Sequence, residues 1–265
     1  MQLPPPFAVV RAGLRPLAVQ LHRCRAMWLF RNSAAYLAAL RQCGPGAVLL
    51  QTRDGLRIEM RNNLWDARIV RETFFERPYL RHCRLSAAPT VVDIGAYIGD
   101  FSLFAAHYLG GRVVAYEPTQ ENLAMLVKNV RLNGLQDRIT VCHRAVGSAS
   151  ELTLSVERND QEVHASSFLF AGGEKRTVPC DRLEEVFSRH ELPEVDLLKI
   201  DCEGGEYEIL LSAPSDLFRR IRHIVFEAHP IPDYRSQLAA TTSKLRGLGF
   251  VVRNHGMIYY ARGIR

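Results

Sequence analysis

The chain has 265 residues, of which 47% are hydrophobic and 23% charged, and a formal net charge of +6. This length and balance predict one α/β domain with an N-terminal extension and a large core. The six scattered cysteines form no C-x-x-C pair, which argues against a disulfide framework or a zinc site and favours a reducing compartment. No run approaches the roughly 18 apolar residues of a membrane span.

The first part of the chain is basic. No Asp or Glu precedes Asp54, whereas seven arginines do. These arginines interrupt the apolar runs, so the sequence does not predict a secretory signal, and a cytoplasmic location is expected. A weak contact with an anionic membrane surface, nucleic acid or an acidic carrier stays open. A solvated helix face is the favoured interpretation, because the arginines form no tight cluster. The oligomeric state is undetermined.

Residues 1–85 are predicted to form a helical and hairpin extension. A Pro-rich start and one or two helices reach about residue 43, and Gly44-Pro45-Gly46 is a break. Two β-type runs around Asp54-Gly55 predict a hairpin over residues 47–61. Residues 66–85 are predicted to be helical, with an interruption at Pro78.

Residues 86–265 are predicted to form the main domain, in which strands and helices alternate. Such repeats predict a parallel sheet covered by helices on both faces. The final runs predict an antiparallel hairpin around His255-Gly256. His164, Ser166 and Ser167 are expected in a polar loop that binds sugar hydroxyls or covers the site, or else forms a surface turn. The predicted strands are 90–95, 112–117, 138–146, 151–156, 195–201, 221–229, 250–254 and 257–262, and the helices are 100–108, 119–132, 181–190, 205–212 and 232–248.

The turn after the first of these strands has an informative spacing. Asp93, Gly95 and Gly99 give D-x-G-x-x-x-G, not the G-x-G-x-x-G of a dinucleotide site. Ligands of parallel sheets bind at the carboxyl ends of the strands, and an acid there would repel a pyrophosphate. Gly95 allows close approach of the backbone, and Gly99 allows close strand–helix packing.

Glu117 ends the second parallel strand, 18 residues after Gly99. An acid in this position typically accepts both ribose hydroxyls. A ligand with a ribose and positive charge but no phosphate is S-adenosylmethionine, which is therefore the predicted cofactor. The alternative is a tight turn with a helix-capping Asp93 and a surface Glu117.

Several segments together resemble the FkbM-type methyltransferases. They are VVDIGAYIGDFSLFAA, VVAYEPTQENLAMLVKNVRLNGL, RAVGS, SSF, LLKIDCEGGEYEILLSA and IVFEAH, within residues 64–229. The resemblance implies a Rossmann-like class I fold with a seven-stranded, mostly parallel sheet and an antiparallel last strand. It also implies S-adenosylmethionine as methyl donor and O-methylation of a hydroxyl on a sugar, glycan or secondary metabolite.

The resemblance also implies roles for individual residues. Asp93, Gly95 and Gly99 would line the methionine end of the cofactor. Glu117 would hold the ribose with Asn122 nearby, Arg144 and Ala145 would flank the adenine, and Asp201 would lie beside the transferred methyl. Tyr97 is a departure, since Asn is more usual there, and its bulk would reshape the floor near the methionine tail.

An alcohol acceptor must also lose a proton, which calls for a general base. Asp201 or Glu203 could act as that base or orient the hydroxyl, and His229 titrates in the useful range. No metal site is predicted, although a divalent metal at the acidic cluster is an open alternative. Glu203 and Glu206 could instead bond the turn and start the following helix.

Two other functions remain possible on the sequence alone. The pI of about 9.1 is compatible with a nucleic-acid methyltransferase. No N-P-P-Y-type motif follows the fourth strand, so a small-molecule or glycan acceptor is favoured and no nucleic-acid partner is expected. A non-catalytic binding protein on the same fold is the other alternative.

Overall fold

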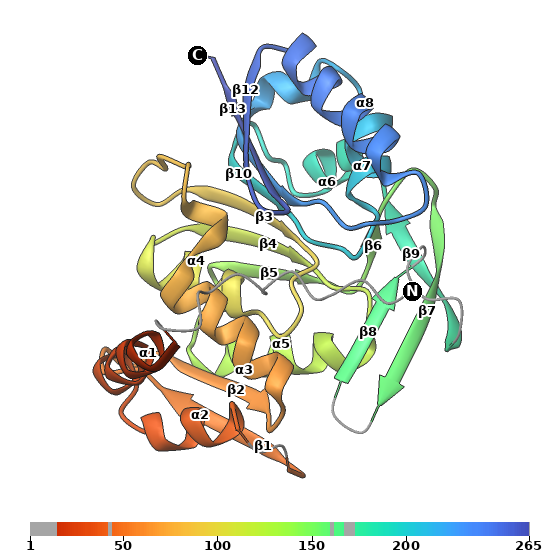
Figure 1. Ribbon diagram of the computed structural model, residues 1–265. Coiled ribbons are helices and arrows are strands. Elements are labelled where there is room, and N and C mark those ends of the chain that lie inside the picture. Colours follow the sequence, from red (N-terminus) through yellow and green to blue (C-terminus); the bar gives the residue numbers. More distant parts are fainter. Residues whose placement is uncertain (1–14, 42–43, 160–161, 167–172, 265) are drawn as a thin grey trace.

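The computed structural model describes residues 15–41, 44–159, 162–166 and 173–264. The N-terminal extension begins with helices α1 (Arg15–Leu29) and α2 (Ser33–Ala39). Strands β1 (Ala47–Gln51) and β2 (Arg57–Arg61) then pair antiparallel, which confirms the predicted hairpin. In Figure 1 these elements lie below helix α3 (Leu64–Arg71), at one end of the molecule. No helix in the described part of the chain is both long and apolar enough to cross a membrane.

The predicted helix over residues 66–85 is wrong in its second half. Helix α3 ends at Arg71, a π-helical turn follows at Glu72–Glu76, and a 3₁₀ turn covers Pro78–Leu80. Arg77 has a left-handed φ of 49° and separates the two turns. A residue before proline avoids the right-handed helical region, which explains why the helix cannot continue through this position.

The central sheet has seven strands in the order β12-β13-β11-β10-β3-β4-β5. Five strands are parallel, and β13, the last in the chain, runs antiparallel to both of its neighbours. The expected mixed sheet is therefore confirmed. The strands are β3 (Thr90–Ile94), β4 (Arg112–Tyr116), β5 (Ile139–Cys142), β10 (Val195–Ile200), β11 (Ile221–Glu227), β12 (Phe250–His255) and β13 (Ile258–Gly263).

Helices cover both faces of this sheet (Figure 1). Because successive side chains of a strand point to opposite faces, Val91 packs in one hydrophobic core and Val92 in the other. The first core contains α4 (Asp100–Tyr108), α5 (Gln120–Leu132) and the N-terminal extension. The second contains α6 (Leu183–Arg189), α7 (Glu206–Ser212) and α8 (Tyr234–Gly247).

A second sheet lies between β5 and α6 in the chain and has the order β6-β9-β7-β8. Its strands are β6 (Ala145–Val146), β7 (Glu151–Asn159), β8 (Glu162–Ser166) and β9 (Glu174–Asp181). The predicted single strand over 138–146 is thus two strands in different sheets. His164 and Ser166 belong to β8, so the polar loop predicted for them is wrong, while Ser167 lies outside the described residues.

Candidate active site

A cavity opens where β3, β4 and β10 end, the edge at which ligands of parallel sheets bind. Its walls come from the strand ends, from β6 and β7 of the second sheet, and from the segment of the extension that runs from α3 to the 3₁₀ turn. The lining includes Trp65, Ile69, Glu72, Thr73, Tyr79, Ile94, Gly95, Tyr97, Asp100, Tyr116, Glu117, Pro118, Thr119, Asn122, Arg144, Ala145, Val146, Leu152, Leu154, Lys199, Asp201, Cys202, Glu203 and Gly205.

The turn after β3 approaches its neighbours too closely for any residue but glycine. Gly95 has a φ of 78°, and a Cβ atom there would lie 1.8 Å from the carbonyl oxygen of Asp201. Gly99 has a φ of 87°, and a Cβ atom would lie 2.5 Å from Cδ1 of Leu126 on α5. Gly95 lines the cavity, whereas Gly99 packs behind it. The two glycines therefore bring this turn against β10 and α5.

Asp93 does not line the cavity but lies fully buried beneath the turn. Lys199 of β10 donates a hydrogen bond of 2.8 Å to its Oδ1, and Ser102 donates one of 2.6 Å to its Oδ2. Lys199 also donates to the carbonyl oxygen of Gly95 at 2.9 Å. Through Lys199, Asp93 therefore holds the turn from below. Lys199 was not predicted, although a lysine inside the apolar run LLKID was a signal, because buried lysines need partners.

Glu117 is held in place by backbone donors. The N–H of Tyr97 donates to Oε2 at 2.9 Å, and the N–H of Thr119 donates to Oε1 at the same distance. Tyr97 has a left-handed φ of 53°, which is uncommon outside glycine. Burial raises the pKa of Glu117, and these hydrogen bonds oppose that rise. The carboxylate is thus fixed in orientation at the end of β4.

The side chain of Tyr97 joins the turn to the N-terminal extension. Its hydroxyl donates a hydrogen bond of 2.8 Å to Asp66 of α3. The guanidinium of Arg61 lies 5.0 Å from the centre of the ring, and Arg61 also donates to Oδ1 of Asn122 at 3.0 Å. The extension therefore supports both Tyr97 and Asn122 in the wall of the cavity.

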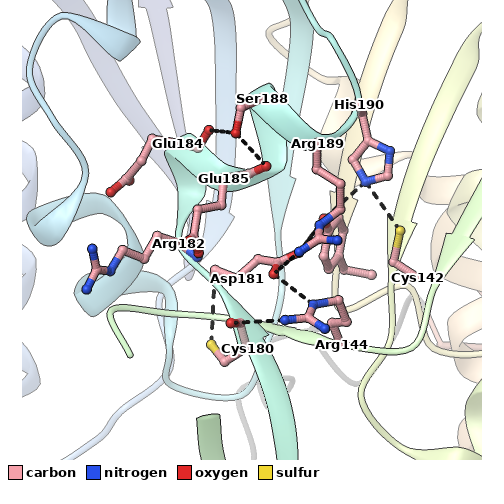
Figure 2. A network of polar contacts seen from close by, with 11 residues as sticks. Cys142, Arg144, Cys180, Asp181, Arg182, Glu184, Glu185, Ser188, Arg189 and His190 are labelled. Atoms are coloured by element: carbon pink, nitrogen blue, oxygen red, sulfur yellow. Dashed lines mark hydrogen bonds and ion pairs between the residues drawn. The ribbon is translucent and has the colours of Figure 1, made fainter. Parts of the chain in front are cut away.

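Arg144 and Ala145, at the start of the second sheet, also line the cavity. Nε of Arg144 donates to Oδ1 of Asp181 at 2.7 Å, and Arg189 donates to both oxygens of the same carboxylate (Figure 2). Burial acts to raise the pKa of Asp181, but the hydrogen bonds from Arg189, Tyr116 and Arg144 together lower it. Asp181 was predicted to begin a helix, but α6 begins at Leu183, so that boundary is wrong. Its role is to fix Arg144 against the cavity.

Asp201 follows β10 and faces the cavity. The hydroxyl of Tyr79 donates to Oδ2 at 2.6 Å, and Nζ of Lys199 lies 4.0 Å from the same oxygen. The other oxygen, Oδ1, lies 3.8 Å from Nε2 of His229. Tyr79 comes from the 3₁₀ turn of the extension, and the sequence did not identify it as a site residue.

His229 is anchored by Glu206, which is fully buried at the start of α7. Oε1 of Glu206 accepts from the backbone N–H of His229 at 2.7 Å and lies 3.3 Å from Nδ1 of the ring. On the other side of the ring, Nε2 lies 3.6 Å from Oε2 of Glu203. Although burial lowers the pKa of His229, the bond to Glu206 and the surrounding carboxylates raise it to about 10. The imidazole is therefore protonated at neutral pH.

Three further carboxyl groups near the site titrate close to neutrality, and one of them is Asp100, whose pKa burial raises to about 7. Burial and the neighbouring Glu76 raise the pKa of Glu72, on the cavity wall, to about 7. Burial and Asp201 raise the pKa of Glu227, at the end of β11, to about 8. Sequence reasoning missed Glu72, because its position in a π-helical turn facing the cavity is set by tertiary packing.

Asp201, Glu227 and His229 could together bind a metal ion. One ligand atom from each lies within 4.8 Å of the others. Glu206 also contacts the other nitrogen of the His229 ring, as carboxylates that orient metal-bound histidines do. The geometry permits an ion here without requiring one, because the proton on His229 already offsets part of the negative charge.

The charges around the cavity suit a cationic ligand without phosphate. Five acidic side chains line the wall, Glu72, Asp100, Glu117, Asp201 and Glu203, although Glu72 and Asp100, with pKa values of about 7, are only partly ionised at neutral pH. Lys199 and Arg144 are the two long cationic side chains of the wall. Each pairs with an aspartate that does not line the cavity, Lys199 with Asp93 and Arg144 with Asp181. The acidic side chains would repel a phosphate, and the two cations that could neutralise it are already paired with aspartates. S-adenosylmethionine, with its sulfonium and amino group, fits these residues.

The strand order, the glycine turn and the acid at the end of β4 define a class I S-adenosylmethionine-dependent methyltransferase. The family model for the Methyltransferase FkbM domain matches residues 93–252, more than half of the chain. The protein therefore belongs to the FkbM methyltransferase family, and its cofactor is S-adenosylmethionine.

Known relatives and structures were found as well. The 31-O-demethyl-FK506 methyltransferase FkbM of Streptomyces tacrolimicus is 29% identical, over 69% of this chain and 81% of the relative. Methyltransferase sdnD of Sordaria araneosa is 25% identical, over 66% and 81%. Among solved structures, the precorrin-6y C5,15-methyltransferase of Geobacter metallireducens has 18% identity and a TM-score of 0.43, covering 70% of this chain and 86% of that one. The N-terminal domain of human METTL16 has 16% identity and a TM-score of 0.43, covering 75% and 68%.

Proposed function

We propose that the protein transfers a methyl group from S-adenosylmethionine to a hydroxyl of a small organic acceptor, such as a sugar, a glycan or a secondary metabolite. The observation that carries this proposal is the position of Asp201. Asp201 lines the cavity, its Oδ2 is engaged by Tyr79, and its Oδ1 forms no hydrogen bond with any described residue. The relative from Streptomyces tacrolimicus carries an O-demethyl substrate in its name, which supports an oxygen acceptor.

In this proposal the predicted cofactor residues bind different parts of S-adenosylmethionine. Glu117 would hold the ribose with Asn122 beside it, and Arg144 and Ala145 would flank the adenine. Gly95 and Tyr97 would border the methionine end, while Asp93 and Gly99 act from behind by fixing the turn. When bound, the cofactor supplies a methyl carbon that its positive sulfur makes electrophilic.

The acidic cluster would handle the acceptor hydroxyl. Asp201 would orient the hydroxyl and receive its proton as the carbon–oxygen bond forms. Because His229 already carries a proton, it serves as a fixed positive charge beside Asp201 and Glu203 rather than as the base. Its imidazolium lies within 4 Å of an oxygen of each carboxylate, so the opposite charges attract and hold the two side chains beside the ring.

Three variants and a matched control test these assignments. Asp201→Asn keeps the shape of the side chain but cannot accept the proton, so cofactor binding by calorimetry persists while turnover falls by about 10²–10⁴-fold. His229→Gln lowers turnover with cofactor binding retained, because it removes the positive charge. Glu117→Ala loses cofactor binding, and Asp216→Asn, an exposed site before β11, changes neither.

Turnover would be measured by mass spectrometry of a panel of hydroxylated glycosides and macrolide alcohols. Normal turnover by Asp201→Asn would remove Asp201 from the reaction. Transfer only to amines or carbon acceptors would overturn O-methylation while leaving the family unaffected.

A further inference from the structure

A second hollow of about 340 Å³ lies on a sheet face away from the cavity described above. Its position follows from strand register. His223 of β11 pairs with Arg262 of β13, and Tyr260 of β13 pairs with Arg253 of β12. Residues two apart on one strand share a face, so these four side chains lie on the same side of the sheet.

Helix α8 does not cover this face. Leu245 of α8 packs in the core on the other side, together with Phe250 and Ala261 of the same two strands. The hollow is bordered instead by the segment after the 3₁₀ turn. The centres of the His82 and Tyr260 rings lie 4.7 Å apart, edge to face. Nε2 of His223 lies 3.2 Å from the carbonyl oxygen of Arg84.

Histidine 223 helps to fix this border rather than to add charge. It is buried, and burial lowers its pKa, so the ring is neutral at physiological pH. The carbonyl of Arg84 can only accept, which places the ring proton on Nε2. His223 therefore holds the main chain of Arg84 against β11, and the side chain of Arg84 remains exposed at the rim.

Four arginines surround the hollow, and among the residues that the structure describes no acidic side chain lines it. They are Arg81, Arg84, Arg253 and Arg262, all exposed. Within the part of the chain that the structure describes, no carboxylate forms an ion pair with any of these four.

Asp196, the acidic residue whose charge acts on His223, already has its own partners. Asp196 accepts hydrogen bonds from Ser86 and from the backbone N–H of Thr90, and it lies 3.6 Å from Arg222. By contrast with the four arginines, Arg222 is also paired with Glu194. The hollow thus concentrates positive charge that the neighbouring acids do not neutralise.

We propose that this hollow binds a phosphate-bearing anion with the charge of a diphosphate. Guanidinium groups match phosphate oxygens in pairs, and several guanidinium groups around one concave site favour a multivalent anion over a single carboxylate. The diphosphate group could belong to a free soluble ligand or, as phosphate groups presented on a surface, to an anionic lipid.

The hollow is connected to the active site through one segment. The hydroxyl of Tyr260 donates to the carbonyl oxygen of Pro78 at 2.6 Å, and the next residue, Tyr79, donates to Asp201. An anion here therefore binds beside the segment that supports Asp201. The proposal does not depend on the identity of the methyl acceptor.

Calorimetry with sodium pyrophosphate at constant ionic strength tests the proposal. The wild-type protein binds pyrophosphate, and Arg253→Gln with Arg262→Gln weakens binding by at least about tenfold, because two charge-assisted contacts are lost. Arg222→Gln, an exposed arginine of β11 with its own acidic partners, leaves binding unchanged. Arg81→Gln with Arg84→Gln, on a different element, repeats the test if the strand variant does not fold.

Flotation with phosphatidylcholine vesicles, with and without phosphatidylglycerol, separates the two sources. Binding to the anionic vesicles that needs Arg253 and Arg262 assigns the site to lipid, and pyrophosphate binding alone assigns it to a soluble ligand. Equal weakening by Arg222→Gln, or binding of a mixed-sequence RNA without binding of pyrophosphate or vesicles, would overturn the proposal.

Discussion

The hydroxyl of Tyr97 donates a hydrogen bond of 2.8 Å to Asp66, across the boundary between the cofactor turn and helix α3. Tyr97→Phe removes this bond but keeps the ring beneath Arg61. We expect an affinity for S-adenosylmethionine about three- to tenfold lower and a loss of about 1 kcal/mol in the free energy of unfolding. Calorimetry and urea denaturation measure the two effects.

Tyr108→Phe is the matched control for this substitution. Tyr108 donates to Asp54 at 3.1 Å in an exposed contact, away from the cavity. It should leave cofactor affinity unchanged. An unchanged affinity in Tyr97→Phe as well would show that the extension does not help to position the cofactor turn.

Replacing Gly95 with alanine should disrupt the site more severely. The new Cβ atom would lie 1.8 Å from the carbonyl oxygen of Asp201 in a backbone conformation that disfavours side chains. We expect a loss of more than about 2 kcal/mol in the free energy of unfolding and no measurable cofactor binding. Gly247→Ala is the control, because nothing lies within 4 Å of its Cβ position at the end of α8, and it should be neutral or slightly stabilising. Similar stability of the two variants would contradict the close contact.

The raised pKa of Glu72 predicts a specific pH dependence of stability. Between its ordinary pKa of 4.5 and its folded value of about 7, the folded protein binds more protons than the unfolded chain, so this group lowers stability as the pH rises. Glu72→Gln removes that penalty. The variant's free energy of unfolding, measured by urea titration relative to the wild type, should rise by about 1–3 kcal/mol between about pH 5 and about pH 8. The exposed Glu151→Gln controls for the introduced amide, and a gain that does not change with pH would refute the assignment.

Metal removal distinguishes the two interpretations of the cluster around His229. We expect turnover to persist in EDTA, because an ion at Asp201, Glu227 and His229 would have to displace the proton that Glu206 and the other acids hold on the ring. The assay compares dialysed enzyme with and without added Mg²⁺ or Mn²⁺. Loss of activity in the chelator, with recovery on adding either ion, would assign a metal to these three residues.

Much of the architecture could be predicted because local signals agree with tertiary packing. The sequence predicted the strand of the apolar run TVVDIG, the glycine turn after it and the following helix. The ends of the predicted strands also identified the edge of the sheet where the cavity lies. The second sheet was largely missed. Its strands β8 and β9 are polar, and only alternate residues of β7 and β9 face a small core, so their sequences lack a strong apolar pattern.

Site residues that belong to a local sequence motif could be predicted. Side chains that reach the site from elements distant in the sequence could not. The close approach of Gly95 follows from a turn motif. The contacts of Tyr79 with Asp201 and of Tyr97 with Asp66 join segments 122 and 31 residues apart, and no local pattern encodes them. The charge state of His229 also depends on carboxylates from two other elements, which explains why the sequence left its role open.

The hydrophobic core that joins the N-terminal extension to the sheet has a consequence for how this enzyme can diverge. Phe30, Leu50 and Ile58 are buried together with Val91 and Leu103, so the outer wall of the cavity and the cofactor turn belong to one cooperative folding unit. Under the proposed function, a substitution that reshapes the wall contributed by the extension would be transmitted to cofactor affinity through the same packed side chains. A new acceptor preference would therefore have to evolve together with cofactor affinity, and grafting the extension of a relative onto this sheet should unfold the chimera before it changes specificity.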